Sequence, residues 1–498
     1  MSEIAAGWRA LGDMLRDPQA LGFLAYLALV LIIGIATART NRSSQDYFLA
    51  GRRLPGWVGA FSERASGESA WLLIGLPGLF FVDGFGALWV AVGCATGILF
   101  SWTFIAPRLR ASTAADGSLT IPDYLENRFG NGRHSLRLVA TLVVLFFYTL
   151  YVSAQVVAAG KVLETAFGLP VTAGMALGTG IIVLYTLLGG FLAVALTDVV
   201  QGLLMVLTLV LLPVVGIITL GGFGPMGEAI AAVDPDLLRV SAGRGGHALW
   251  IGLVIGSLGI GLGYMGQPHL LTRFMAVRSH RQLRQGTGVA LIWTSLSFWG
   301  AILVGAVGLA LLQQGGLPGL PAGAELDDRE RIMPLVAQAL LNPWLAGVLI
   351  SAAIAAMMST ADSQLLVATS AMAEDLCHKL LGWDLPARTM VGLSRVTTLM
   401  LGLLAFLLAL YAQEYVFHLV LYAWAGLGAV FGPVLLLGLW WRNCTRAGAL
   451  TGMLTGLVVM LVWTRVPALK GMVYELVPAF LASFLATVLV SHLNRRSV

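Results

Sequence analysis

Apolar runs of about 20 residues recur along the whole chain, and this recurrence limits the possible folds more than any other feature. One such run, as an α-helix, spans the roughly 30 Å hydrocarbon core of a bilayer. Hydrophobic residues make up 58% of the 498 positions and charged residues only 11%, whereas a soluble domain carries about 25% charge. A membrane β-barrel would show short alternating runs instead. The sequence therefore predicts an all-α integral membrane protein.

We expect about 13 transmembrane helices in a single transmembrane domain that covers residues 1–498. An extra N-terminal helix at 20–38 precedes two groups of five spans, 55–220 and 246–441, and two further C-terminal helices follow at 446–492. The expected spans are 20–38, 55–82, 85–108, 136–167, 171–189, 191–220, 246–272, 286–313, 342–377, 391–411, 414–441, 446–464 and 471–492.

Arginine and lysine are unevenly distributed over the expected loops. With the N-terminus outside, the cytoplasmic loops hold twenty of them, including those in 39–53, 108–137 and 273–284, and the outer loops hold eight. Because cytoplasmic loops of membrane proteins are enriched in Lys and Arg, this distribution predicts an N-terminus outside and a C-terminus in the cytoplasm. The net charge of +5 has the same origin and requires no nucleic-acid partner.

A polar stretch, residues 62–78, interrupts the second span. It places Glu63, Arg64 and Glu68 around Gly67 within about two helical turns. A charge at bilayer depth costs about 2.5–3.5 kcal/mol on insertion scales, so such residues face a partner or a wet cavity. We therefore expect a discontinuous helix near 65–70, whose free carbonyls could bind an ion or a solute. In the alternative, the helix enters the membrane at Trp71 and Arg64–Glu68 is an i,i+4 surface pair.

A second interruption is expected near 256–266. Five glycines within residues 256–266 precede Gln267, Pro268 and His269 in the span 246–272. Glycines alone would indicate a close-packed helix face, but the proline and its polar neighbours favour a break. The two interrupted helices open the two groups of five spans, and this is typical of secondary transporters built from inverted repeats.

Carboxylates and hydroxyls gather in two other spans. Asp198 lies near the start of one span, and Ser359, Thr360, Asp362 and Ser363 fall within about one turn of another. Hard cations such as Na⁺ prefer carboxylate, hydroxyl and carbonyl oxygens. A single hydroxyl more often bonds the carbonyl four residues earlier, but that does not explain a buried Asp362 beside it. We therefore expect an ion site here.

Other functional classes lack support in the sequence. The three cysteines are far apart and indicate neither disulfides nor a metal site. There is no P-loop, no GxSxG elbow and no recognisable nucleophile–base pair, so we expect a transporter and not an enzyme. No filter loop indicates a channel, and no feature indicates an obligate protein partner. H⁺ coupling through Glu68 or Asp362, and a sensor that binds solute without moving it, remain open alternatives.

Seven stretches resemble the sodium/solute symporter family, most closely its sodium/proline symporter branch. They lie in order between about residues 40 and 380: YFLAGR at 47–52, WLLIGLPG at 71–78, LTIPDY at 119–124, GGFLA at 189–193 with Thr197-Asp198, GYMGQPH at 263–269, RFM at 273–275, and MST at 358–360 with EDL at 374–376.

This resemblance implies a leucine-transporter-type fold of two inverted five-helix repeats and solute import by Na⁺-driven alternating access across a bacterial-type plasma (inner) membrane. The Na⁺ cofactor would bind the carbonyls of Ala65, Glu68 and Ala356 and the hydroxyls of Ser359 and Thr360. A possible second Na⁺ site would use Asp198, Ser359, Asp362 and Ser363. The expected solute-binding residues are Glu68, Ser69, Trp71, Tyr151, Ile260, Tyr264, Gln267 and Pro268.

Two departures from the proline branch bear on the solute, and a third is Asp362, where that branch has a serine and which could supply compensating charge to the ion site. Gly67 stands where proline symporters carry an aspartate, and Ile260 where they carry a tryptophan. Glu68 could replace the lost carboxylate only if unwinding reorients it, since one residue turns a regular helix by about 100°. L-proline is the first expectation for the solute; a different amino acid or a small carboxylate carried with H⁺ is the alternative.

Overall fold

The computed structural model describes residues 17–37, 48–130, 134–188, 190–384, 386–411 and 415–495. Apart from one isolated bridge between Leu54 and Val277, these residues form helices and the turns between them. Ten of the described helical runs are long and apolar enough to cross a membrane, and two shorter apolar helices accompany them. The prediction of an all-α protein with many membrane-crossing helices is confirmed.

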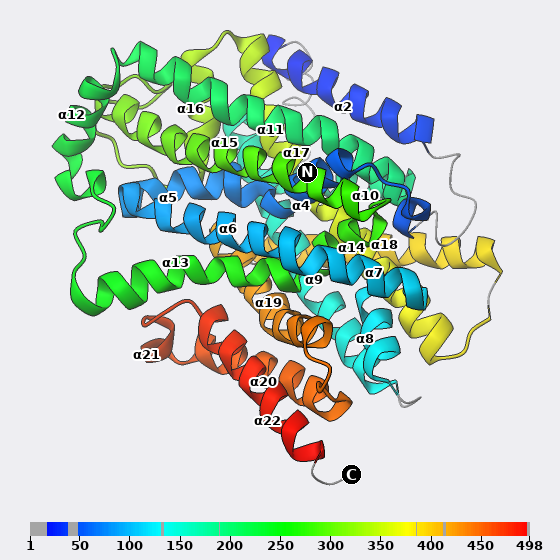
Figure 1. The fold of residues 1–498 in the computed structure, drawn as a ribbon. Coiled ribbons are helices and arrows are strands. Elements are labelled where there is room, and N and C mark those ends of the chain that lie inside the picture. The colour runs from blue at the N-terminus through cyan, green and yellow to red at the C-terminus, as the bar shows by residue number, and fades with distance from the viewer. Residues whose placement is uncertain are drawn as a thin grey trace.

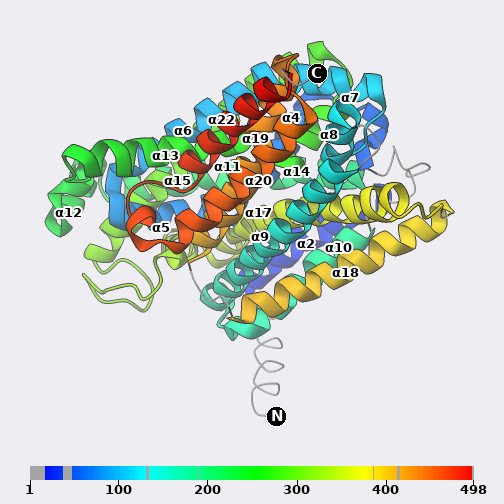
Figure 2. The same cartoon turned by 90° about the horizontal axis from the view of Figure 1, so that it is seen from below.

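The helices assemble into one bundle (Figure 1). Figure 2 shows α18 and α10 along one flank, with α20 and α22 on another. In chain order the α-helices are α2 (Pro18–Thr37), α4 (Gly56–Ala70), α5 (Leu76–Asp83), α6 (Leu88–Phe100), α7 (Ala106–Asp116), α8 (Ile121–Phe129), α9 (Ser135–Phe167), α10 (Val171–Leu188), α11 (Phe191–Thr219), α12 (Phe223–Val233), α13 (Gly256–Gly259), α14 (Pro268–Ala276), α15 (His280–Gln313), α16 (Ile332–Leu340), α17 (Pro343–Ser370), α18 (Ala387–Tyr411), α19 (Val416–Trp440), α20 (Arg446–Arg465), α21 (Pro467–Lys470) and α22 (Leu476–Arg495).

The expected spans coincide closely with these helices. The expected spans 55–82 and 85–108 lie within one helical run of 61 residues, Gly56–Asp116. This run turns at Gly84, whose φ of 49° suits glycine, and in Figure 1 it runs left along α5 and returns right along α6. Residues 38, 189 and 414, at the edges of three expected spans, lie outside the described residues.

The first expected interruption is present. Ser69 leaves the helical region with φ 34° and ψ −166°, and a π-helical segment, η3 (Trp71–Gly75), follows it. Only glycine, which lacks a Cβ, adopts this backbone conformation readily. At a serine the conformation is strained, so the surrounding packing must hold it in place. The break lies in the polar stretch that the sequence indicates.

The second interruption lies slightly later than expected. The chain stays helical through 256–266, although η8 (Ile260–Gly266) is wound as a tighter 3₁₀ helix after the π-helical η7 (Ala248–Ile255). The break itself falls at Gln267, which is extended with φ −93° and ψ 102°. Pro268 explains this position, because a proline disfavours the α conformation in the residue before it.

Helix α17 lies at the centre of the bundle. It packs against α2, α4, α9 and α11, and every described side chain from Leu349 to Ser370 is buried. The broken helix α4 packs against α11, α15 and α17. The polar break of α4 is therefore enclosed on three sides by long apolar helices.

Close backbone contact between α6 and η8 can be tested with a glycine substitution. A Cβ on Gly97 would lie 2.2 Å from the carbonyl oxygen of Gly261, a backbone atom that cannot move aside cheaply. We expect Gly97→Val to destabilise the protein by about 1–3 kcal/mol through overpacking, measured as a lower Tm in detergent. Gly180→Val, at a helical glycine with nothing within 4 Å, is the control and should leave the Tm nearly unchanged.

Candidate functional site

The residues expected to bind Na⁺ meet where α4 breaks against α17. Ser359 Oγ donates to the Ala65 carbonyl at 2.9 Å and to the Ala356 carbonyl at 3.0 Å. Thr360 Oγ1 donates to the Ser66 carbonyl at 2.9 Å and not to that of Glu68. The Glu68 carbonyl instead accepts the Trp71 backbone N–H. A cluster of buried oxygens therefore links the two helices, and its donor set suits a hard cation such as Na⁺.

Two residues of the possible second Na⁺ site, Asp198 and Ser363, contact the guanidinium of Arg273. Arg273 donates to Asp198 Oδ2 at 3.2 Å and, through a shorter contact, to Ser363 Oγ. It also donates to Ser62 Oγ and Ser66 Oγ, both at 3.1 Å, and to the His269 carbonyl at 2.8 Å. A tethered cation thus already occupies much of this oxygen cluster.

Asp362 completes this second cluster. Its Oδ1 accepts from Ser363 Oγ at 3.2 Å, while Asp362 Oδ2 and Asp198 Oδ1 are buried without a hydrogen-bond partner. Two carboxylates therefore share the one positive charge of Arg273. The assignment of Arg273 to a cytoplasmic loop was wrong: it lies on α14 and its side chain is 0% exposed.

A third cluster surrounds Arg64 on α4. Arg64 donates to both oxygens of Glu63 and, at 2.5 Å, to Glu68 Oε1. The Tyr264 hydroxyl also donates to Glu68 Oε1, at 3.0 Å, and Trp102 Nε1 donates to Glu63 at 3.0 Å. The Arg64–Glu68 pair exists, but the alternative of a surface pair is wrong because both side chains are 0% exposed.

Glu68 and the neighbouring position 67 both lie beside Arg64. The helix is regular up to Ser69, so Glu68 points towards Arg64 and Tyr264. A Cβ on Gly67 would lie 3.6 Å from Arg64 Nη2 and 3.3 Å from Leu270 Cδ2. The two positions therefore share Arg64 but differ in their second neighbour, as the turn of about 100° per residue allows.

The expected solute-binding residues lie around the same break, and all are buried. Trp71 packs between Phe298 and Phe417, with ring centroids 5.6 and 6.0 Å away. Tyr264 packs edge-on against Trp424 at 4.7 Å, and Gln267 Nε2 donates to the Trp424 carbonyl at 3.1 Å. The remaining members are Ser69 at the break, Tyr151 on α9, Ile260 on η8 and Pro268 at the start of α14.

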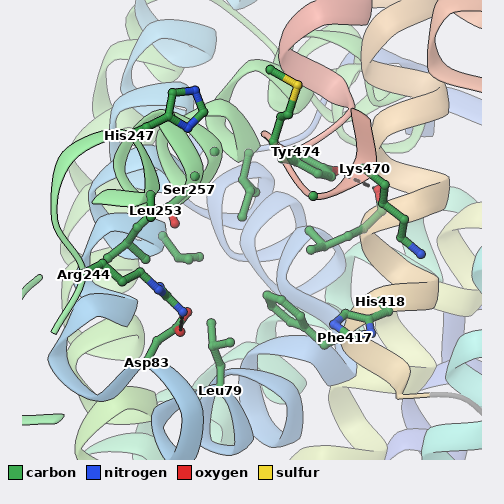
Figure 3. A pocket seen from close by; sticks show the side chains of 18 residues that line it. Leu79, Asp83, Arg244, His247, Leu253, Ser257, Phe417, His418, Lys470 and Tyr474 are labelled. Atoms are coloured by element: carbon green, nitrogen blue, oxygen red, sulfur yellow. Dashed lines mark hydrogen bonds and ion pairs between the residues drawn. The ribbon is translucent and has the colours of Figure 1, made fainter. Parts of the chain in front are cut away.

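A cavity of about 620 Å³ opens above this region (Figure 3). Its lining includes Ile260 and Phe417, so it reaches the residues that pack over Trp71. The Asp83–Arg244 ion pair, at 2.6 Å, lies on its wall, and Lys470 and His418 lie opposite. The cavity is lined by α5, α6, η7, α13, η8, α19, α21 and the turn after α21.

Ion pairs tie the opposite end of the bundle together. Asp123 on α8 accepts from Arg137 at 2.8 Å and from Lys379 at 2.7 Å. Asp375 accepts from Thr120 Oγ1 at 2.7 Å and lies 3.5 Å from Arg137. These contacts join α8, α9 and η10 (Ala371–Leu380) through charged side chains.

Several residues of these clusters were not predicted from the sequence. They are Ser62, Ser66, Trp102, Gln155, Arg273 and Trp424. The serines lie in the polar stretch 62–78, and the RFM motif contains Arg273, so both had a sequence signal. Gln155 had a weaker signal, an amide within an apolar span. In the described part of the chain no three His, Cys, Asp or Glu side chains are arranged to hold a metal ion.

Broken helices that gather polar side chains inside a membrane bundle, beneath a cavity open at one end, define the class of secondary transporters. The comparisons with known proteins agree. The model of the Sodium:solute symporter family matches residues 47–456. The chain therefore belongs to the sodium:solute symporter family, and it is a multi-pass transporter that uses Na⁺ as its coupling ion.

The chain is similar to curated relatives over nearly its full length. The sodium/proline symporter of Escherichia coli (strain K12) is 39% identical over 479 residues, 96% of this chain and 93% of the relative. The osmoregulated proline transporter OpuE of Bacillus subtilis (strain 168) is 38% identical over 473 residues, 95% and 94% of the two chains.

Solved structures show the fold. A Na⁺-coupled sialic acid symporter in a substrate-bound outward-open state aligns with a TM-score of 0.81 at 19% identity, over 96% of this chain and 98% of that one. MhsT in complex with L-phenylalanine aligns with a TM-score of 0.54 at 16% identity, over 88% and 97%. At these identities the likeness concerns the fold, which is that of the leucine-transporter type.

The buried guanidinium of Arg273 makes a strong stability prediction. Arg273→Met would leave Asp198 and Asp362 buried without a cation, and breaking such a pair costs about 3–5 kcal/mol. We expect a large fall in Tm and in the yield of monodisperse protein, measured by thermal unfolding and size exclusion in detergent. Arg278→Met, at an exposed arginine five positions on, is the control. Equal Tm values for the two variants would contradict the described role of Arg273.

Proposed function

We propose that this chain imports L-proline together with Na⁺ by alternating access. The main structural support for the Na⁺ position is a pair of hydrogen bonds at the break of α4. They run from Ser359 and Thr360 of α17 to the carbonyls of Ala65 and Ser66. A Na⁺ ion bound between the hydroxyl and carbonyl oxygens, with the hydroxyl hydrogens turned away, would hold the two helices together. The names of the curated relatives support proline as the solute.

Sodium and solute would be coupled through α4. The ion would bind on the α17 side of the break, and the solute would bind against Ser69, Trp71, Tyr151, Ile260, Tyr264, Gln267 and Pro268. Since both ligands favour the same arrangement of the break, each would tighten the binding of the other. The membrane potential would add about 2.3 kcal/mol per charge per 100 mV to inward movement.

The proposed topology has thirteen spans with two inverted five-helix repeats, 55–220 and 246–441. Counting the run that turns at Gly84 as two spans, and adding the two shorter apolar helices, brings the ten long helices to this number. Helix α2 would precede the repeats, and α20 and α22 would follow them. The loop charges support an N-terminus outside and a C-terminus in the cytoplasm of a bacterial inner membrane.

A second cation position is also proposed, at Asp198, Ser359, Asp362 and Ser363. Asp198 Oδ1 and Asp362 Oδ2 lack partners beside Arg273, and the cluster carries one more carboxylate than arginine. A second Na⁺ or a proton would balance this charge. The same observation favours the second candidate function, symport with H⁺ in place of Na⁺.

Uptake by proteoliposomes tests the proposed function. We expect L-proline uptake to require an inward Na⁺ gradient at constant pH and to rise with an inside-negative potential, because net positive charge moves inward. Choline in place of Na⁺ serves as the control. Full uptake in choline would overturn Na⁺ coupling, and uptake driven by a pH gradient alone would support the H⁺ alternative. No proline uptake under either condition would retire proline as the solute.

Thr360→Ala tests the Na⁺ position. The loss of one hydroxyl ligand, worth about 1 kcal/mol or slightly more, should raise the Na⁺ concentration for half-maximal uptake by about fivefold to tenfold. Thr369→Ala is a matched control on the same helix, because its hydroxyl contacts Thr398 away from the break. An unchanged Na⁺ dependence in Thr360→Ala would place the ion elsewhere.

A further inference from the structure

The buried charges next to the break of α4 do not balance. Glu63 and Glu68 carry two negative charges and Arg64 one positive charge, and the three side chains are at most 1% exposed. A buried charge without compensation is costly, most of all inside a membrane. This cluster therefore lacks one positive charge.

The deficit is located at a single atom. Both oxygens of Glu63 accept hydrogen bonds, from Arg64 and Trp102. Glu68 Oε1 accepts two, from Arg64 and Tyr264, but Glu68 Oε2 is buried and has no partner. Buried acceptors are nearly always hydrogen-bonded, so a donor is missing at this atom. Glu68 immediately precedes Ser69, the residue at which the helix breaks.

Two donors without partners lie across the break on α9. Gln155 Oε1 accepts the Ala70 backbone N–H at 3.2 Å, which fixes the amide beside the break, while its Nε2 has no partner. Tyr151 lies one turn earlier on the same face of α9, close to Ser69, and its buried hydroxyl also has no partner. An amide N–H and a phenol O–H are the donors that a carboxylate accepts from.

We propose that Glu68 and Gln155 determine the class of solute: Glu68 Oε2 binds the charged amine of an α-amino acid, and Gln155 Nε2, with the Tyr151 hydroxyl, binds its carboxylate. This proposal rests on the proposed function, Na⁺-coupled solute import. The amine supplies the one positive charge that the Glu63–Arg64–Glu68 cluster lacks. A carboxylate without an amine leaves Glu68 Oε2 unpaired and adds a negative charge nearby, so the site selects against it.

Selection by an unpaired buried group is strong. A site built to hydrogen-bond a polar group rejects the analogue that lacks it by about 10⁴–10⁵ in the most favourable cases. Here the missing group is also charged, while Arg64 and Tyr264 still stabilise Glu68 through its other oxygen. We therefore expect discrimination of at least about a hundredfold between an amino acid and its analogue without the amine.

A competition assay tests the proposal. Wild-type proteoliposomes with an inward Na⁺ gradient are first given a panel of radiolabelled amino acids to identify the solute. If L-proline is taken up, the competitors are L-proline, tetrahydrofuran-2-carboxylate, in which oxygen replaces the ring nitrogen, and pyrrolidine, which lacks the carboxylate. If another amino acid is taken up instead, proline is retired as the solute and the corresponding acid without its amine is used. The proposal is then tested in the same way.

The wild type should bind the amino acid at least about a hundredfold more tightly than the analogue without the amine. A ratio near one would overturn the proposal, because the amine would then contribute nothing to binding at Glu68 Oε2. Uptake of no amino acid would overturn it as well. These outcomes need no variant and so do not depend on the folding of one.

Variants separate the two contacts. Glu68→Gln should weaken binding of the amino acid at least tenfold. It should also reduce the discrimination ratio, because the analogue without the amine makes no contact with Glu68 Oε2 and so loses no affinity. Gln155→Leu should weaken the binding of the amino acid and of its analogue by the same factor, because both carry the carboxylate. Glu63→Gln is the matched control: it removes the same charge from the same cluster, but both Glu63 oxygens already have partners. Size exclusion and Na⁺-induced thermal stabilisation verify folding.

The Glu63→Gln control distinguishes a direct contact between the amine and Glu68 from a general effect of the net charge of the cluster. If Glu63→Gln lowers the ratio as much as Glu68→Gln does, the selection comes from the net charge of the cluster and the proposed contact at Glu68 is wrong. If Glu68→Gln keeps the ratio while it folds normally, the amine is bound elsewhere. A lower ratio in Glu68→Gln alone, together with equally weakened binding of both compounds in Gln155→Leu, supports both assignments. Unchanged binding of both compounds in Gln155→Leu would overturn the assignment of the carboxylate to Gln155.

Discussion

The polar break of α4 persists inside an apolar bundle because two buried arginines neutralise most of the charge around it. Arg64 binds Glu63 and Glu68 within α4 itself, and Arg273 joins α4 to α11 and α17 through Ser62, Asp198 and Ser363. Arginine suits this role because its planar fork can satisfy several acceptors and keeps its charge when buried. Without these two residues, the carboxylates would have to be protonated or the helix would have to leave the membrane interior.

Each arginine neutralises only one of two carboxylates, and this incomplete balance links stability to ligand binding. One unpartnered oxygen remains at Glu68 and two remain at Asp198 and Asp362. Both deficits lie against the same short piece of α4, so a cation bound at one and an amine bound at the other would stabilise the same conformation, as proposed above. The coupling between them is reciprocal, as linkage requires. A break with fully balanced charges would be more stable, but it would leave no unpartnered oxygen for a ligand to pair with.

Features carried by local sequence could be predicted, and features made by long-range packing could not. Helix lengths, the break in residues 62–78 and the hydroxyls of Ser359 and Thr360 follow from apolar periodicity and from the cost of polar groups in lipid. Arg273 was assigned to a loop because it begins the basic stretch 273–284, whereas contacts with α4, α11 and α17 bury it. Gln155 faces the break across a sequence distance of 85 residues, which no local pattern encodes.

The lining of the cavity indicates how access to the break is limited. Phe417 lies both in the cavity lining and on the ring of Trp71, so it separates the open space from the residue that follows the break. Its backbone N–H and that of Val416 donate to Glu330, which also accepts from Lys161. The start of α19 is thus anchored by a carboxylate, as helix N-termini favour. Movement of Phe417 therefore requires either a side-chain rotation or the release of this anchor. The first requires less rearrangement, since it leaves every backbone hydrogen bond of α19 in place.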